Sequence, residues 1–188
     1  MNDKPKIRAE IRAKRSLMPK EDKEQAQQRI GDLVLQAIQT CGLPTASVIA
    51  LYWPMADEPN ITDIASVLTS QGFTLALPAA TDENMSLEFR LWGGGQPRIY
   101  DALQMPTSDG EVVKPNVIVA PLLAMDDYGM RLGQGGGYYD RTFEKFSQAL
   151  RIGVCFNVQR VGGKLPHEPH DVPLHMGIDE KGVTVWQA

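Results

Sequence analysis

Short apolar runs alternate along this chain with segments in which apolar residues recur at helical spacing. The runs are Val48–Tyr52, Phe73–Leu77, Asn116–Ala120 and Arg151–Phe156. A continuous apolar run of this length is typical of a strand buried on both faces, as in parallel sheets. Strands separated by helices therefore predict an α/β fold: a single-domain three-layer sandwich over residues 1–188, with a mostly parallel central sheet flanked by helices.

Four segments are predicted to be helices. The first covers residues 4–18, and Pro19 then suits the first position of a second helix, which ends near Gly42. A third helix contains Ile61–Leu68, and a fourth spans residues 139–149. The second has a clear 3.6-residue apolar period, which places one face of a helix against a core, and the first has a thin apolar stripe.

Two further strands and a long loop complete the predicted organisation. Residues 86–91 alternate in polarity and predict an antiparallel or edge strand, and Val183–Trp186 predicts the last strand. Pro78 and Pro121 follow apolar runs and are expected to end them, because proline donates no ladder hydrogen bond. Residues 93–115 are rich in turn formers and predict a loop.

The overall composition excludes several classes of protein. A net charge of −4 gives no general basic face, so we expect no nucleic acid partner. No apolar run approaches 18 residues, so we expect no membrane span. Cys41 and Cys155 lie far apart and show no disulfide pattern, which favours a reducing, cytoplasmic location. We expect a monomer.

The glycine-rich segment 129–141 indicates an anion site. Four glycines fall between Gly133 and Gly137, just before a predicted helix. Bare backbone N–H groups at a helix N-terminus bind phosphate readily, and Arg131 adds a cation at the entrance. Asp140 offers a carboxylate suited to Mg²⁺ beside a triphosphate. The alternative is a surface turn in which Asp140 only complements the helix dipole.

Three loops are expected to meet at this segment. The glycine segment follows the strand that ends at Ala120, residues 52–60 follow another strand, and residues 157–171 follow a third. In open α/β sheets, ligands bind outside the carboxyl ends of the strands. The sequence therefore predicts one site at that edge of the sheet.

Familiar nucleotide, zinc and hydrolase motifs do not fit. The glycine segment matches neither the dinucleotide fingerprint nor the P-loop. His167 and His170 have the wrong spacing for a zinc helix, and Pro169 forbids that helix. No Gly-x-Ser-x-Gly elbow is present, so serine hydrolysis has no support.

Four blocks of sequence together resemble the 5-formyltetrahydrofolate cyclo-ligase family, also called 5,10-methenyltetrahydrofolate synthetases. They are Lys4–Arg15, then Leu51–Glu58, then Ala120–Asp126 with Gly129–Asp140, and last Gly153–Gln159 with Leu165–Asp171. The third block, with its Gly-Met-Arg-Leu-Gly-Gln-Gly-Gly-Gly-Tyr-Tyr-Asp run, is the most specific. The resemblance implies ATP- and Mg²⁺-dependent cyclisation of 5-formyltetrahydrofolate to 5,10-methenyltetrahydrofolate, with release of ADP and phosphate.

The resemblance also implies roles for individual residues, with Arg131 and Glu58 as the catalytic pair. The implied ATP contacts are Lys4, Pro5, Lys6, Ile7, Arg8, Arg131, Leu132, Gly133, Gln134, Gly135, Gly136, Gly137, Tyr138 and Tyr139. The implied folate contacts are Trp53, Glu58, Gln134, Gly135, Gly136, Gly137 and Tyr138, and the implied Mg²⁺ ligands are Asp140 and Asp171. Taken alone, each has a plainer interpretation: a solvated helix face for Lys4 and Arg8, core packing for Trp53, a loop carboxylate for Glu58 and a turn residue for Asp171.

Some positions depart from the family pattern. Gln134 stands where an aromatic or basic residue is frequent, His175 stands where an aspartate is common, and Pro59–Ile61 replaces a different tripeptide. The role of Asp126, close to the glycine segment, stays open. Two other functions remain as alternatives: a nucleotide-binding protein that has lost turnover, and a sugar-phosphate isomerase-like enzyme.

Overall fold

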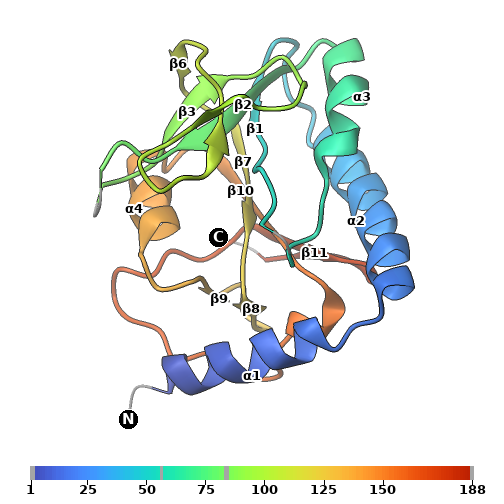
Figure 1. The fold of residues 1–188 in the computed structure, drawn as a ribbon, viewed down its shortest axis with the longest axis vertical. Coiled ribbons are helices and arrows are strands. Elements are labelled where there is room, and N and C mark those ends of the chain that lie inside the picture. The colour runs from blue at the N-terminus through green and yellow to red at the C-terminus, as the bar shows by residue number, and fades with distance from the viewer. Residues whose placement is uncertain (1–2, 56, 83–84, 187–188) are drawn as a thin grey trace.

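An eight-stranded sheet forms the centre of the protein (Figure 1), which the computed structural model describes over residues 3–55, 57–82 and 85–186. The strand order is β12-β11-β10-β7-β1-β2-β3-β6. The strands are β1 (Val48–Ala50), β2 (Thr74–Ala79), β3 (Glu88–Leu91), β6 (Val112–Val113), β7 (Val117–Pro121), β10 (Leu150–Val154), β11 (Met176–Asp179) and β12 (Gly182–Val185). The five strands from β2 to β11 in this order are parallel. Strand β12 pairs antiparallel with β11 at one edge, and at the other side β3 pairs antiparallel with β2 and with the edge strand β6. The predicted mostly parallel α/β sheet is confirmed.

Helices cover both faces of this sheet (Figure 1). They are α1 (Lys4–Ser16), α2 (Lys20–Thr40), α3 (Ala65–Ser70) and α4 (Tyr138–Lys145), with short 3-10 turns at Thr62–Ile64 and Asn157–Gln159. On one face, α2 and α3 lie beside each other, and α4 covers the opposite face. Among the described helices, none combines the length and apolar character that crossing a bilayer requires.

Alternation along the strands builds the two cores. Ile49 and Leu51 enter the core shared with α2 and α3, whereas Ala50 between them enters the core shared with α4. The same alternation in β2 and β7 places Ala76 and Ala120 on the α4 face. Small residues there leave room for the aromatic side chains that dominate this second core, because protein interiors are close-packed.

The side on which the chain adds strands to the sheet changes between β1 and β7. From β1 it moves outward to β2 on one side, and from β7 it moves outward through β10 to β11 on the other. Such a switch point opens a crevice at the carboxyl ends of the two central strands, where open α/β sheets bind ligands. The fold therefore places a candidate site beyond Ala50 and Pro121.

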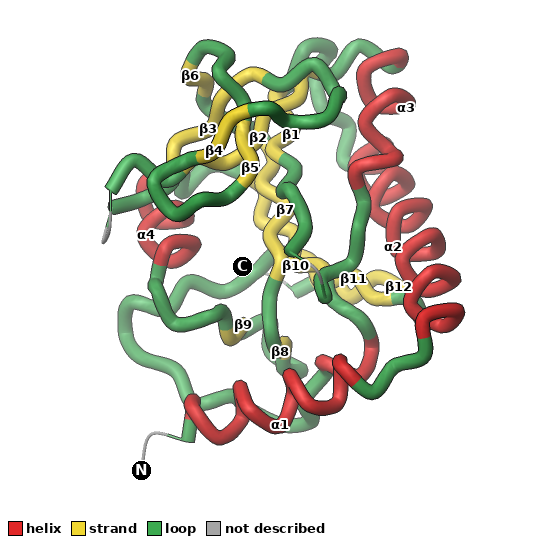
Figure 2. Tube along the Cα trace, viewed as in Figure 1, coloured by secondary structure: helices red, strands yellow, loops and turns green. Residues whose placement is uncertain are grey.

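Helix α1 lies across that end of the sheet instead of covering a face. Its Ile11 packs with Ala124, Leu132 and Leu165 in a small separate core. Ala124 and Leu132 belong to a two-stranded hairpin, β8 (Ala124–Met125) and β9 (Arg131–Leu132), which Figure 2 shows close to α1. The hairpin thus fixes the N-terminal helix beside the segment that follows β9.

Several boundaries differ from the sequence prediction. Pro19 is the extended residue before α2, not its first helical residue. Pro78 and Pro121 lie inside the ends of β2 and β7, where a missing N–H breaks few ladder bonds. The predicted helix over 139–149 ends at Lys145, because Phe146 leaves helical geometry.

The sequence prediction also missed strands. The predicted loop 93–115 contains β4 (Ile99–Tyr100) and β5 (Pro106–Thr107), which pair with each other, and the edge strand β6. Strand β11 was not predicted either, since Met176–Asp179 has neither a continuous apolar run nor strict alternation. It is defined by its parallel pairing with β10.

Candidate active site

A cavity of about 510 Å³ opens at the carboxyl ends of β1 and β7. Its lining comes from the segment after β1, the end of β7, the glycine segment and the loop before Val172. These contribute Tyr52, Trp53, Met55 and Glu58, then Pro121–Leu123, then Gly133–Gly137, and then Glu168, His170 and Asp171. The three loops that the sequence analysis expected to converge do so here. Helix α1 adds a fourth element to the wall.

The glycine segment has a backbone that other residues would not readily adopt. Gly135 has a φ of +116° and Gly137 a φ of +66°, and Gly137 is the N-cap of α4. A Cβ atom on Gly136 would lie 2.7 Å from the ring of Tyr138. The segment therefore presents backbone rather than side chains to the cavity, in front of a helix N-terminus.

Helix α1 fastens this segment by two hydrogen bonds. Nε of Arg8 donates to the carbonyl of Gly133 at 2.9 Å, and Nη2 of Arg12 donates to Oε1 of Gln134 at 2.7 Å. The sequence analysis did not single out Arg12. Gln134, which departs from the family pattern, thus has a definite partner on α1.

Only part of the N-terminal block reaches the cavity. Lys4 and Arg8 line it, whereas Pro5, Lys6 and Ile7 do not. Residues four apart share a helix face, so Lys4 and Arg8 point the same way. Lys6 is exposed with its Nζ 4.0 Å from Glu10, and Ile7 packs against the small core beneath α1. The other site residues predicted from the sequence all line the cavity.

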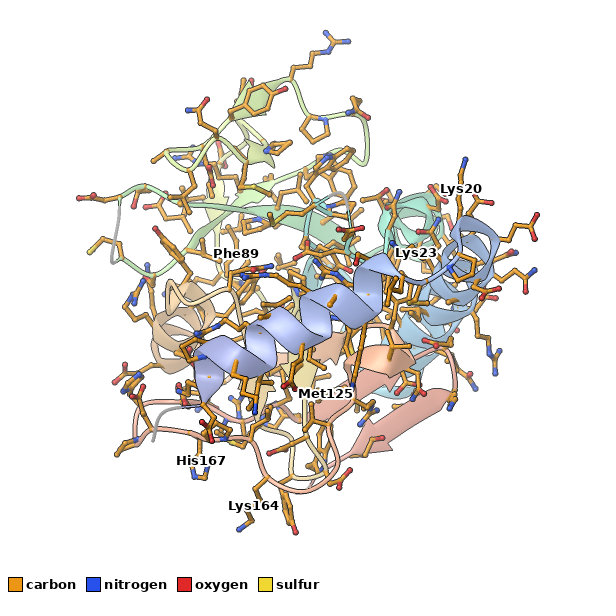
Figure 3. The ribbon with its side chains drawn as sticks, turned by 60° about the horizontal axis from the view of Figure 1, so that its bottom comes forward. Lys20, Lys23, Phe89, Met125, Lys164 and His167 are labelled. Atoms are coloured by element: carbon orange, nitrogen blue, oxygen red, sulfur yellow. The ribbon has the colours of Figure 1, made fainter. Side chains whose placement is uncertain are left out.

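Lys4 joins α1 to the loop at 168–171. Its Nζ lies 2.8 Å from Oδ2 of Asp171 and 3.3 Å from Oε2 of Glu168, and the Lys4 and Asp171 side chains are about nine-tenths buried. Burial alone would raise the pKa of Asp171, but hydrogen bonds from Lys4 and from the Glu168 N–H lower it. The carboxylate is therefore held ionised. In Figure 3, which looks onto α1, His167 of the same loop lies beside the N-terminal part of this helix, and Lys20 and Lys23 mark the start of α2 beyond its other end.

A second ion pair holds Arg131 inside the site. Its Nη2 donates to Oδ1 of Asp140 at 2.8 Å, and its Nη1 donates to the carbonyl of Val172 at 2.7 Å. The guanidinium carbon lies 4.4 Å from the centre of the Phe143 ring, and only 4% of the side chain is exposed. Burial lowers the pKa of Arg131, an effect that Asp140 opposes. Arg131 is thus a fixed cation rather than a mobile one.

Glu58 is a buried carboxylate in the cavity wall. The backbone N–H of Met55 donates to its Oε2 at 3.0 Å. Burial raises the pKa of Glu58, although the Met55 N–H and the charge of Arg15 oppose the shift. Arg15 itself is buried, and neither its Nε nor its Nη1 has a hydrogen-bond partner among the described residues. Glu58 is therefore poised to accept a proton or hydrogen bonds from a bound molecule.

Aromatic rings surround this carboxylate. Trp53 is half-buried, and its ring stands nearly perpendicular to that of Trp92 with 6.2 Å between centroids. Burial, and then the charge of Glu58, raise the pKa values of the Tyr52 and Tyr139 hydroxyls. The hydroxyl of Tyr52 donates to the carbonyl of Pro59, which anchors the turn that carries Glu58.

The β4–β5 hairpin supplies an apolar wall that the sequence analysis missed. Leu103, Met105 and Pro106 line the cavity from this hairpin. Asp101 shapes the turn, because its Oδ1 accepts the N–H groups of Leu103 and Met105 at 2.9 Å each. An Asp at the start of such a turn is a sequence signal for it, because Asp side chains accept hydrogen bonds from the backbone that follows, but it does not reveal what the turn faces.

Asp126 has a structural role, which answers the question left open above. It is fully buried, and its carboxylate accepts the backbone N–H groups of Tyr128, Met130 and Leu165 at 2.8–2.9 Å. These bonds fix the turn between β8 and β9 and tie it to the start of the loop that ends at Asp171. Asp126 therefore positions the site without lining it.

The donor set suits a hard divalent cation. The ligand atoms of Glu168, His170 and Asp171 lie within 4.8 Å of one another, and Asp140 lines the same cavity. The Lys4 ammonium already lies against Asp171 and Glu168, so a positive charge fits this position. Carboxylate oxygens are the ligands that Mg²⁺ prefers.

Comparison with known proteins shows the family of this chain. The sequence profile of the 5-formyltetrahydrofolate cyclo-ligase family matches residues 1–179. The chain belongs to this family of ligases. A Haemophilus influenzae protein named 5-formyltetrahydrofolate cyclo-ligase is 28% identical over 185 residues, which cover 89% of this chain and 92% of that protein.

Solved structures of 5,10-methenyltetrahydrofolate synthetases share the fold. The protein from Aquifex aeolicus is 24% identical, with a TM-score of 0.77 over 99% of this chain and 94% of that one. The protein from Mycoplasma pneumoniae is 24% identical, with a TM-score of 0.76 over 95% of this chain and 99% of that one. The family membership places this enzyme in folate and one-carbon metabolism.

Proposed function

We propose that this cyclo-ligase family member converts 5-formyltetrahydrofolate to 5,10-methenyltetrahydrofolate, consumes ATP with Mg²⁺ and releases ADP and phosphate. The observation that carries the proposal is a single cavity with two kinds of wall. A glycine loop with paired cations and carboxylates lines one part, and a buried carboxylate with apolar and aromatic side chains lines the rest. Such a cavity suits a phosphorylated molecule held against an aromatic one.

The chemistry explains why ATP is consumed. A formamide carbonyl carbon is a poor electrophile, and its oxygen is a poor leaving group. When this oxygen attacks the γ-phosphorus, the bond to the bridging oxygen of ADP breaks and a phosphate ester forms on an iminium-like carbon. The neighbouring anilino nitrogen then attacks that carbon, and phosphate leaves with the former carbonyl oxygen and takes up the proton that the nitrogen loses. The protein has to align the two substrates and neutralise phosphoryl charge.

The glycine segment and its flanking charges are assigned to the nucleotide. The N–H groups of Gly135–Gly137 and the N-terminus of α4 receive the phosphates. Arg131 and Lys4 supply positive charge, and Arg8 holds the loop from α1 while it faces the cavity. Asp140 and Asp171 would hold Mg²⁺, which supplies further neutralisation of phosphoryl charge when bound.

The walls around Glu58 are assigned to the folate. Glu58 accepts hydrogen bonds from N–H groups of the pterin, and Trp53 offers a ring face or edge beside it. The wall from Leu103 to Pro106 covers the apolar, aromatic part of the molecule. A carboxylate buried among aromatic groups binds N–H donors more strongly than one in water, because the local dielectric constant is low.

A direct assay tests the reaction. Protein, MgATP and 5-formyltetrahydrofolate are mixed, and the near-ultraviolet absorbance of the methenyl product is followed together with ADP release. We expect product and ADP in equal amounts, and neither without ATP. ATP binding without turnover would instead support a nucleotide-binding protein, and turnover of a sugar phosphate would support an isomerase.

A matched pair of variants locates the folate site. Glu58→Gln removes the buried carboxylate, and Asp57→Asn removes the adjacent exposed one, which pairs with Lys23 at 3.1 Å. We expect Glu58→Gln to bind 5-formyltetrahydrofolate about tenfold or more weakly, since hydrogen bonds to charged groups contribute roughly 1.5–3 kcal/mol. Asp57→Asn should bind it as the unaltered protein does. Equal folate affinity in both variants would refute the assignment of Glu58.

A further inference from the structure

Two cations assigned to the nucleotide phosphates, Lys4 and Arg131, are already paired with carboxylates assigned to the metal. Lys4 contacts Asp171, and Arg131 contacts Asp140, both at 2.8 Å. All four side chains line one cavity, and each is 80% or more buried. Within these two pairs, each charge is neutralised by its partner.

We propose that these two ion pairs make the site select the metal complex of the nucleotide over either component alone, through an exchange of partners. This inference rests on the proposed function. With Mg²⁺ and a triphosphate present together, Asp140 and Asp171 would hold the metal in place of the cations. Lys4 and Arg131 would then contact the phosphates in place of the carboxylates. Each of these four side chains has an opposite charge beside it before and after binding.

Either component alone leaves charges unpaired. Metal-free ATP competes with Asp171 for Lys4, and the carboxylate it displaces would then lie in a mostly buried position without its cation. Mg²⁺ alone displaces the Lys4 ammonium in the same way. Removing one partner of a buried ion pair is costly, because the other charge stays desolvated and uncompensated.

The surroundings of the two ion pairs allow the pairs to separate and exchange partners. Lys4 has a second carboxylate contact at 3.3 Å, with Glu168, whose side chain is half exposed. Asp171 keeps the hydrogen bond from the Glu168 backbone N–H at 2.8 Å when Lys4 moves. Oδ1 of Asp140 carries the contacts to Arg131 and Val172, and no hydrogen bond to its Oδ2 occurs within the described residues. When a pair separates, its carboxylate thus keeps a backbone N–H donor and has an oxygen that a ligand can reach.

Calorimetric titration of metal-free ATP in EDTA, of MgATP, and of Mg²⁺ alone tests the exchange. The unaltered protein should bind MgATP at least tenfold more tightly than metal-free ATP. Asp171→Asn frees Lys4 from the carboxylate charge and should bind metal-free ATP about fivefold more tightly, the order expected for a partly buried ion pair. The same variant should bind MgATP more weakly.

The control separates partner exchange from a general charge effect. Glu10→Gln removes one negative charge from α1 outside both pairs and should leave all three affinities unchanged. Conversely, Lys4→Met should bind Mg²⁺ alone more tightly, because Asp171 loses its ammonium. The Mg²⁺ titration of Lys4→Met does not depend on whether Asp171→Asn folds. Thermal melting verifies the fold of each variant.

The outcomes are distinct. If the unaltered protein binds neither form of ATP, the proposed function fails and the exchange fails with it. If it binds MgATP and forms product, but metal-free ATP binds Asp171→Asn no more tightly, the exchange is refuted and the proposed function stands. Unchanged Mg²⁺ affinity in Lys4→Met would refute it equally.

Discussion

Replacing Asp126 by Asn should destabilise the fold although the side chain hardly changes shape. The carboxylate is fully buried and accepts three backbone N–H groups. Oδ1 accepts Tyr128 and Met130, and Oδ2 accepts Leu165. The amide oxygen of Asn can take the place of Oδ1 and keep two of these bonds. Its NH₂ group then faces the Leu165 N–H, so that two donors meet without an acceptor.

The magnitude follows from this geometry. One hydrogen bond to a charged group is lost, worth about 1.5–3 kcal/mol, and a buried donor without a partner costs about 1–3 kcal/mol more. The free energy of unfolding should therefore fall by about 2.5–6 kcal/mol, which corresponds to a decrease in Tm of roughly 5–24 °C for a chain of this size. Urea denaturation followed by circular dichroism measures the first quantity, and calorimetry measures the second.

Asp127 provides the matched control. It is the next residue along the chain and exposed, and its Oδ2 accepts one N–H, from Gly163 at 2.8 Å. Asp127→Asn should lower the free energy of unfolding by less than about 1 kcal/mol. If Asp126→Asn loses no more stability than Asp127→Asn, the three hydrogen bonds do not fix this turn, and the reasoning from them is wrong.

Three further predictions concern the site and its surroundings. His175 faces two donors of Arg151, at 3.0 and 2.8 Å, and burial followed by the charge of Arg151 lowers its pKa. The unfolded chain therefore binds protons first, and the free energy of unfolding should fall as pH drops from about 6.5 toward the lowered pKa. Urea denaturation at pH 7 and pH 5 should show a smaller fall in His175→Asp, and an equal fall would contradict this account. Arg131→Lys cannot contact both Asp140 and Val172 through a planar fork, so calorimetry should show weaker MgATP binding and nearly unchanged folate binding. Gly136→Val should also bind MgATP more weakly, because its Cβ would lie 2.7 Å from the Tyr138 ring; unaltered affinity would show that the loop is not the phosphate site.

The elements with strong local signals were predictable. The runs at Val48–Tyr52 and Asn116–Ala120 are apolar on both faces because helices cover both faces of the sheet, and they form its two central strands. The glycine segment was equally clear, since few structures other than a tight loop tolerate such a run. By contrast, β11 and the β4–β5 hairpin are too short to carry a period, and pairing with distant partners defines them.

For the candidate site, the sequence by itself determined which chemical groups are available, and the tertiary structure decided which of them meet. Lys4 and Asp171 are 167 positions apart, and no local pattern indicates that they form an ion pair. Likewise, helical spacing puts Lys4 and Arg8 on one face of α1, but it does not say which face meets the cavity. The hairpin beneath α1 decides that Lys4 and Arg8 face the cavity and that Pro5, Lys6 and Ile7 do not. Residue type and short-range period are local properties of a chain. Which side chains contact each other across the cavity depends on how several elements pack together, and only the folded structure specifies that packing.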